Sequence, residues 1–144
     1  MKPGRFEYLI FILFGVFHLH RIWGLIDRQS YADLWLGLMR ERGVVYFLLM
    51  GVLAGACIYG IFMFFRNLHQ NFWWRWIYVF GGGYVLFDLF AIATGWEFWQ
   101  ELILKMFDVD AWYWDLEWGA FIALGAFSLI LGIKIKCSTR NCEH

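Results

Sequence analysis

Ionisable side chains inside apolar runs are the positions of this sequence where chemistry would be expected. Asp88 lies within the apolar run 76–96, and His20 and Arg21 lie within the run 8–26. A charged side chain in the core of a bilayer is costly, and such residues usually face one another, a water-filled cavity or an ion pathway. An imidazole titrates near neutral pH and can relay a proton to a carboxylate. We therefore predict an ion or proton site formed by Asp88, His20 and Arg21.

A structural role is the alternative for the same residues. Arg21 and Asp88 can neutralise each other, and a buried pair of this kind can fix the register of helices. His18 is a further candidate for the ion site, but it lies two positions from His20. That spacing places the two imidazoles on roughly opposite sides of a regular helix, where they cannot bind the same ion. A haem with two axial histidines would need another histidine within a span, so the sequence assigns no cofactor.

The C-terminal tail offers a second, softer set of ligands. Cys137, Cys142 and His144 could bind a soft metal ion, and Glu143 lies beside them. A Cys-x4-Cys-Glu tail on a four-span protein resembles the bacterial mercuric-ion transporters of the four-helix kind. Those proteins also carry a cysteine pair in the first span, where this chain has FHLH at 17–20. The resemblance implies soft-metal handling, and the simpler interpretation is a reduced cytoplasmic tail.

Composition places the chain in the membrane class. It is 62% hydrophobic and 23% aromatic, with a net charge of +0, whereas soluble domains average roughly 45–50% apolar residues. The sequence contains four apolar runs, 8–26, 44–65, 76–96 and 118–133, each close to the length that crosses a bilayer. We predict one all-α domain, 1–144, with four transmembrane helices in a bundle and a polar tail, 134–144. The neutral balance gives no reason to expect a nucleic-acid partner, and the lack of HExxH, GxSxG or phosphate-loop motifs favours a protein without enzymatic activity.

The polar segments 27–43 and 97–117 have the periodicity of amphipathic helices. Apolar side chains recur three and four positions apart in both segments, and Ser30 followed by Asp33 predicts an N-terminal cap in the first. We expect both helices to lie in the membrane interface on the extracytoplasmic side. The apolar positions are Tyr31, Leu34, Trp35, Leu38 and Met39 in the first segment, and Trp99, Leu102, Ile103, Met106 and Phe107 in the second.

The two halves of the chain align without gaps at an offset of 68 residues. The offset predicts two copies of helix, interfacial helix and helix, related by a pseudo-twofold axis along the membrane normal, unless two apolar hairpins match by coincidence. Gly51 and Gly55 form a GxxxG face, which favours close helix packing, and the offset relates them to Gly119 and Ala123. The offset also relates His20 to Asp88, Asp33 to Glu101 and Arg66 to Lys134.

Basic residues are concentrated at the N-terminus, in the link 66–75 and in the tail, while the segment 97–117 is acidic. By the positive-inside rule we expect an integral, multi-pass protein with both termini in the cytoplasm. One interpretation is a transporter-like or channel-like protein that uses the Asp88 site. Another is an accessory subunit of a larger membrane complex, and soft-metal handling by the tail is a third. The expected partners are the lipid bilayer and either further copies of the chain or other membrane subunits.

Overall fold

The computed structural model describes residues 7–70 and 72–140, and within these ranges it contains helices and short connections but no β-strand. Two short 3-10 helices, η1 (Leu68–Gln70) and η2 (Trp73–Arg75), connect α4 to α5. The α-helices are α1 (Glu7–Leu19), α2 (Ile22–Ile26), α3 (Arg28–Glu41), α4 (Val44–Arg66), α5 (Trp76–Thr94), α6 (Glu97–Met106) and α7 (Trp114–Arg140).

Four helical segments are long and apolar enough to cross a membrane. They are Glu7–Ile26, Val44–Arg66, Trp73–Thr94 and Trp114–Ser138, which confirms the four apolar runs and the all-α class predicted from the sequence. Helices that satisfy their own backbone hydrogen bonds are one of the few structures that can span lipid. The structure therefore supports a small multi-pass membrane protein.

The ends of two spans differ from the predicted ends. The third span stops at Thr94, before Trp96, because Gly95 adopts a left-handed conformation with φ of 72°. The Trp96 N–H then donates to the Ala91 carbonyl, which satisfies an acceptor at the helix end. The fourth span continues past 133, and the polar residues 134–140 extend α7 by almost two further turns.

The helices predicted within 27–43 and 97–117 are present as α3 and α6, but α6 ends at Met106, residues 107–113 form turns, and 114–117 belong to α7. The predicted cap of the first one is wrong, because α3 begins at Arg28 and not at Ser30. The Ser30 N–H donates to the Asp27 carboxylate over 3.1 Å, so Asp27 provides the cap from the position before the helix. Ser30 therefore lies in the first turn of α3.

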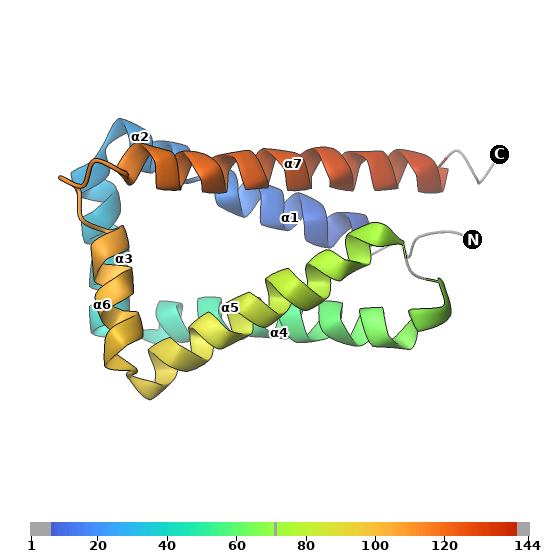
Figure 1. The fold of residues 1–144 in the computed structure, drawn as a ribbon, viewed down its shortest axis with the longest axis horizontal. Coiled ribbons are helices and arrows are strands. Elements are labelled where there is room, and N and C mark those ends of the chain that lie inside the picture. The colour runs from blue at the N-terminus through green and yellow to red at the C-terminus, as the bar shows by residue number, and fades with distance from the viewer. Residues whose placement is uncertain (1–6, 71, 141–144) are drawn as a thin grey trace. The chain divides into compact units, whose positions relative to one another are not determined.

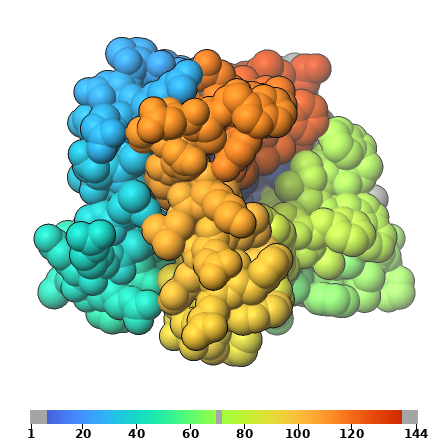
Figure 2. Space-filling model, turned by 60° about the vertical axis from the view of Figure 1, so that its left-hand side comes forward, coloured from blue at the N-terminus to red at the C-terminus, as the bar shows by residue number. Residues whose placement is uncertain are grey.

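The chain forms two compact units, residues 1–35 with 106–144 (unit 1) and residues 36–105 (unit 2). In unit 1, α1 and α7 run antiparallel side by side, and α2 packs against the beginning of α7 (Figure 1). The core at this end consists of Tyr31, Ala32, Trp114 and Trp118, four residues that expose 2% or less. In the space-filling view the segment that precedes α7 (orange) lies against the segment around α2 (blue) (Figure 2).

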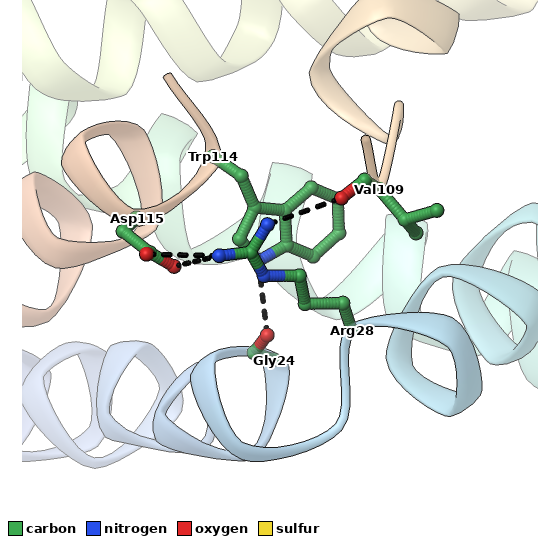
Figure 3. Close-up of polar contacts among 5 residues, drawn as sticks. All are labelled: Gly24, Arg28, Val109, Trp114 and Asp115. Carbon is green, nitrogen blue, oxygen red and sulfur yellow. Dashed lines mark hydrogen bonds and ion pairs between the residues drawn. The ribbon is translucent and has the colours of Figure 1, made fainter. Parts of the chain in front are cut away.

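Three polar contacts join α2, α3 and the beginning of α7 in unit 1 (Figure 3). The buried Trp114 indole donates through Nε1 to the Gly24 carbonyl over 2.9 Å. Arg28 donates to both oxygens of Asp115 at 2.9 Å and to the Val109 carbonyl at 3.2 Å. These bonds hold the chain where it leaves one span and enters another.

Unit 2 consists of the helical hairpin α4–α5 followed by α6. α5 returns along α4 in the antiparallel direction, and α6 turns away from the direction of α5 after Gly95 (Figure 1). Near the closed end of the hairpin Phe64, which is 3% exposed, packs its ring at 4.8 Å from Trp76. Gly60 lies against the Tyr78 ring, where any side chain larger than hydrogen would be tightly packed.

Candidate functional site

The first span is interrupted at His20 and Arg21, two of the predicted site residues. In a continuous helix the Phe17 carbonyl would accept from the Arg21 N–H. Instead the Arg21 N–H donates to the His18 carbonyl over 3.2 Å, and the His20 ring donates through Nδ1 to the Phe17 carbonyl. The side chain of His20 thus replaces a backbone donor, and the 3-10 turn that results separates α1 from α2.

The Arg21 side chain extends from this break onto the aromatic face of α7. Its Cζ lies 4.1 Å from the centroid of Phe121 and 5.1 Å from the centroid of Trp118, as expected for cation–π contacts. Its Nε and Nη1 atoms each expose less than 1 Å² and have no hydrogen-bond partner among the described residues. The guanidinium is therefore enclosed by rings that contact its faces and leave two of its N–H groups unsatisfied.

Tyr31 of α3 completes this cluster from the other side. Its hydroxyl lies 3.3 Å from His20 Nε2, and because His20 Nδ1 carries the proton donated to Phe17, Nε2 accepts from the tyrosine. Tyr31 exposes only 1% of its surface. Burial raises the pKa of its hydroxyl to about 12, so that it remains a hydrogen-bond donor at neutral pH.

Asp88 lies in unit 2, where its partner is an indole. Trp99 of α6 donates through Nε1 to Asp88 Oδ1 over 2.5 Å. The ring of Phe87 packs edge-on against Trp99 at 5.1 Å, and the indole of Trp96 stacks beside Trp99 at 6.4 Å. Within its own unit Asp88 forms no ion pair with a described residue. The predicted common site of Asp88, His20 and Arg21 stays a prediction, because the residues belong to different units.

His20 and Asp88 each form a hydrogen bond with an aromatic residue at the same distance along the sequence. His20 and Tyr31 are 11 positions apart, and so are Asp88 and Trp99. Each pair joins the last turns of a span to the amphipathic helix that follows it. The offset of 68 residues relates His20 to Asp88 and also relates Tyr31 to Trp99. The same kind of contact is therefore made at the same place in both halves.

The helix pairs α1–α7 and α4–α5 also make corresponding contacts. A Cβ added at Gly15 would lie 2.8 Å from the Gly125 carbonyl oxygen and 2.8 Å from the Leu129 nitrogen on α7. On α5, a Cβ at Gly82 would lie 3.5 Å from the Cys57 carbonyl oxygen and 3.5 Å from Ile61 on α4. Cys57 and Ile61 precede Gly125 and Leu129 by the same offset, and Gly82 follows Gly15 with a shift of one residue.

His18 belongs to the interface between α1 and α7. It is 6% exposed, donates through Nδ1 to the Phe14 carbonyl over 3.0 Å, and packs its Cβ against Gly125. Gly51, Gly55 and Gly119, by contrast, have no atom of their own unit within 4 Å of an added Cβ. The packing role of these glycines and of Ala123 stays a prediction, one that concerns contacts beyond each unit.

The predicted soft-metal site lies mostly outside the described residues. Cys137 is an exposed thiol near the end of α7, whereas Cys142 and His144 follow the last described residue. In the described part of the chain no three histidine, cysteine or carboxylate side chains are grouped closely enough to hold a metal ion.

The aromatic partners of the polar residues were not among the predicted site residues. Trp118 and Phe121 enclose Arg21, and Tyr31 and Trp99 bind His20 and Asp88. The repeated spacing of 11 residues between a polar position and an aromatic one was the available signal for the last two. No such signal in the sequence pointed to Trp118 and Phe121, because tryptophan and phenylalanine occur throughout the spans.

Comparison of the chain with protein-family models, with curated proteins and with solved structures finds no significant match.

Proposed function

We propose that this small multi-pass membrane protein moves an ion or proton across the membrane, and that Arg21 and His20 of unit 1 and Asp88 of unit 2 are the polar residues that it uses. The observation that carries the proposal is the half-buried Arg21 side chain, whose Nε and Nη1 atoms are shielded from solvent and have no hydrogen-bond partner in the described chain. Buried polar groups in folded proteins are almost always hydrogen-bonded, and exceptions are concentrated where a ligand or reacting group binds.

The energetics favour function over a purely structural role for Arg21. A cation–π contact contributes roughly 0.5–2 kcal/mol, whereas each unsatisfied buried donor costs roughly 1–3 kcal/mol. A structural arginine would be expected to have its donors bound to backbone carbonyls or to a carboxylate at ion-pair distance. Glu117 attracts Arg21 electrostatically but does not form an ion pair with it among the described residues.

An internal repeat would place Asp88 at the position in its half that corresponds to His20 in the other half. We propose that the chain consists of two copies of helix, interfacial helix and helix related by a pseudo-twofold axis, with α3 and α6 on the extracytoplasmic side. In such an arrangement α1 pairs with α7 as α5 pairs with α4, and the corresponding glycine contacts support this. The bonds of His20 to Tyr31 and of Asp88 to Trp99 support it as well. The polar ends of the first and third spans would then lie at the same depth.

The test is flux into proteoliposomes that contain the purified protein. We expect uptake, followed with a pH-sensitive dye and with anion-selective and cation-selective electrodes, to fall about tenfold or more in Arg21→Gln and Asp88→Asn, because loss of 1.4 kcal/mol of binding already gives tenfold. The matched controls are Arg40→Gln and Glu101→Gln, which remove exposed charges of the same kinds. Flux that is absent in the wild type, or equal in all four variants, would contradict the proposal.

An accessory role in a larger membrane complex is the second candidate. The observation that favours it is the large apolar surface that α4 leaves exposed within its unit, for example Val44 at 76%, Val52 at 73% and Phe47 at 63%. Lipid can cover this surface, and so can other membrane subunits. Native mass spectrometry of the protein extracted from its own membrane distinguishes the accessory role from transport by the protein alone, since a stoichiometric mass of other subunits supports the accessory role.

Soft-metal handling by the tail is tested by titrating the wild type and the Cys137→Ser, Cys142→Ser variant with a soft metal ion. Unchanged binding in the variant would exclude this role.

A further inference from the structure

Three hydrogen-bond donors without partners lie close together in unit 1. They are Nε and Nη1 of Arg21 and Nε1 of Trp118, each shielded from solvent. Trp118 exposes only 2% of its surface, and the guanidinium lies 5.1 Å from the centroid of its ring, so the donors belong to two side chains that are in contact. Neither arginine nor tryptophan has an acceptor to offer, so only a group that accepts hydrogen bonds can satisfy them.

The charge around the cluster determines which acceptor fits. His18 and His20 each donate a ring N–H to a backbone carbonyl, and neither carries negative charge. The Tyr31 hydroxyl donates a hydrogen bond to His20. Glu117, one position before Trp118 on α7, is half-buried and is the one carboxylate among the described residues of unit 1 that interacts electrostatically with Arg21. Because no described carboxylate of unit 1 forms an ion pair with the guanidinium, its positive charge is incompletely balanced there.

We propose that this cluster binds a small anion whose oxygen or halide atoms accept from Arg21 and Trp118. The inference rests on the proposed function and names the class of ion that the Arg21 site takes. A water molecule could accept the same hydrogen bonds, but it would leave the charge of the guanidinium uncompensated in an apolar span. An anion satisfies both requirements, because hydrogen bonds between a guanidinium and an ionised acceptor are shorter and stronger than those with a neutral one.

The position of the cluster gives the anion a short path. Arg21 lies at the break between α1 and α2, five residues before the span ends at Ile26, roughly 8 Å along a helix. The end of the span at Ile26 leads directly into α3, whose first turns supply Tyr31 to the same cluster. The anion would therefore enter from the side of the membrane on which α3 lies, without crossing the full apolar length of the span.

The experiment is equilibrium binding to the full chain in detergent micelles, with radiolabelled chloride and formate as probes and phosphate as a competitor, at constant ionic strength. We expect saturable binding of at least one probe by the wild type. Arg21→Gln should weaken binding of the probe about a hundredfold. Trp118→Phe, which keeps an aromatic ring but loses the indole N–H donor, should weaken it about tenfold. Arg21→Lys retains the charge and should retain part of the affinity. Arg40→Gln is the matched control and should bind as the wild type does.

The variant Asp88→Asn tests the competing possibility that a carboxylate of the chain satisfies Arg21. If the anion is the partner, the wild type itself binds a probe saturably while the Asp88 carboxylate is present. If the wild type binds neither probe but Asp88→Asn does, the partner of Arg21 is Asp88 and the inference is overturned. Binding without any flux would remove the transport proposal and leave this one. Flux that depends on Arg21 without binding of either probe would leave transport, as proton movement, and remove the anion.

Discussion

At the scale of single residues, Trp114 and Arg28 secure the same corner of unit 1 with contacts of different strength. The Trp114 ring is fully buried, and its bond to the Gly24 carbonyl excludes water. In the Arg28–Asp115 pair, Nη2 alone donates to both carboxylate oxygens, and the two side chains expose 39% and 66% of their surfaces. An exposed ion pair contributes roughly 0–1 kcal/mol, because water and salt screen it. A buried acceptor that loses its donor costs roughly 1–3 kcal/mol.

Trp114→Phe should therefore destabilise the protein more than Asp115→Asn does. We expect a loss of at least about 1–3 kcal/mol for Trp114→Phe, since the Gly24 carbonyl loses its donor and the smaller phenyl ring leaves a cavity, and less than about 1 kcal/mol for Asp115→Asn. The measurement is reversible unfolding of the detergent-solubilised protein, followed by far-ultraviolet circular dichroism. Trp112→Phe, at an indole that is 86% exposed, is the control and should have no effect. Equal losses for the first two variants would contradict this order and would mean that the ion pair stabilises the corner as much as the indole does.

The polar candidates could be identified from the sequence, and the aromatic residues that enclose Arg21 could not. Asp88, His20 and Arg21 stand out because a charge or an imidazole within an apolar run has a high desolvation cost, whatever its neighbours. Trp118 and Phe121 do not stand out in a chain with 10 tryptophans and 16 phenylalanines, most of which are equally compatible with lipid. Which ring encloses Arg21 depends on the rotation of α7 about its axis, and composition carries no information about that rotation.

At the scale of helices, the pairs α1–α7 and α4–α5 differ in how closely their backbones approach each other at a few glycines. On α1 and α7, an added Cβ at Gly15 or at Gly132 would lie 3.0 Å or less from backbone atoms of the facing helix. On α4 and α5, the corresponding positions leave ordinary van der Waals distances, 3.5 Å at Gly82. The α1–α7 pair is therefore the closer one, and it depends on the absence of side chains at these positions.

Gly15→Ala should weaken unit 1, whereas Gly82→Ala should be tolerated. The new methyl at Gly15 meets backbone atoms that cannot move independently, and overpacking of this kind costs about 1–3 kcal/mol. Alanine in place of a helical glycine favours the helix by about 0.5–1 kcal/mol, which offsets only part of that loss. Unfolding of the solubilised variants measures the difference. Gly51→Ala, with open space around it, is the control and should be neutral or slightly stabilising. A destabilised Gly51→Ala would instead show that its face packs against a partner.

Hydropathy predicted the four spans, but it could not predict where they break or which of them pair. The interruption at His20 and Arg21 involves neither proline nor glycine. It arises because an imidazole takes the Phe17 carbonyl from the backbone, a choice of rotamer that the sequence does not reveal. Pairing of α1 with α7 depends on Gly15, Gly125 and Gly132, whereas the GxxxG motif drew attention to Gly51 and Gly55. A small-residue motif shows where helices can approach, and the surrounding side chains decide where they do.

At the scale of the whole molecule, the distribution of charge predicts the orientation. Lys134 and Lys136 lie on the last turns of α7, and Arg66 ends α4, whereas α6 and the segment after it are acidic. Arg28, Arg40 and Arg42 are exceptions, because they lie in the segment 27–43 at the opposite end of the spans. With Lys105 they make four basic residues on that side, against seven at the N-terminus, in the link 66–75 and in the tail. The asymmetry therefore still favours cytoplasmic termini, because orientation follows the excess of lysine and arginine near the span ends.

Cysteine labelling in intact cells tests this orientation. With Cys57 and Cys142 replaced by serine, Cys137 is an exposed thiol at the end of α7 and should not react with a membrane-impermeant maleimide unless the cells are permeabilised. In a cysteine-free background, Glu101→Cys on the exposed face of α6 should react in intact cells. Four spans bring both termini to one side, so these two positions must respond oppositely. The reverse pattern would place the basic ends outside, and the anion path to Arg21 would then open to the cytoplasm. Reaction of both positions in intact cells would contradict the four-span arrangement itself.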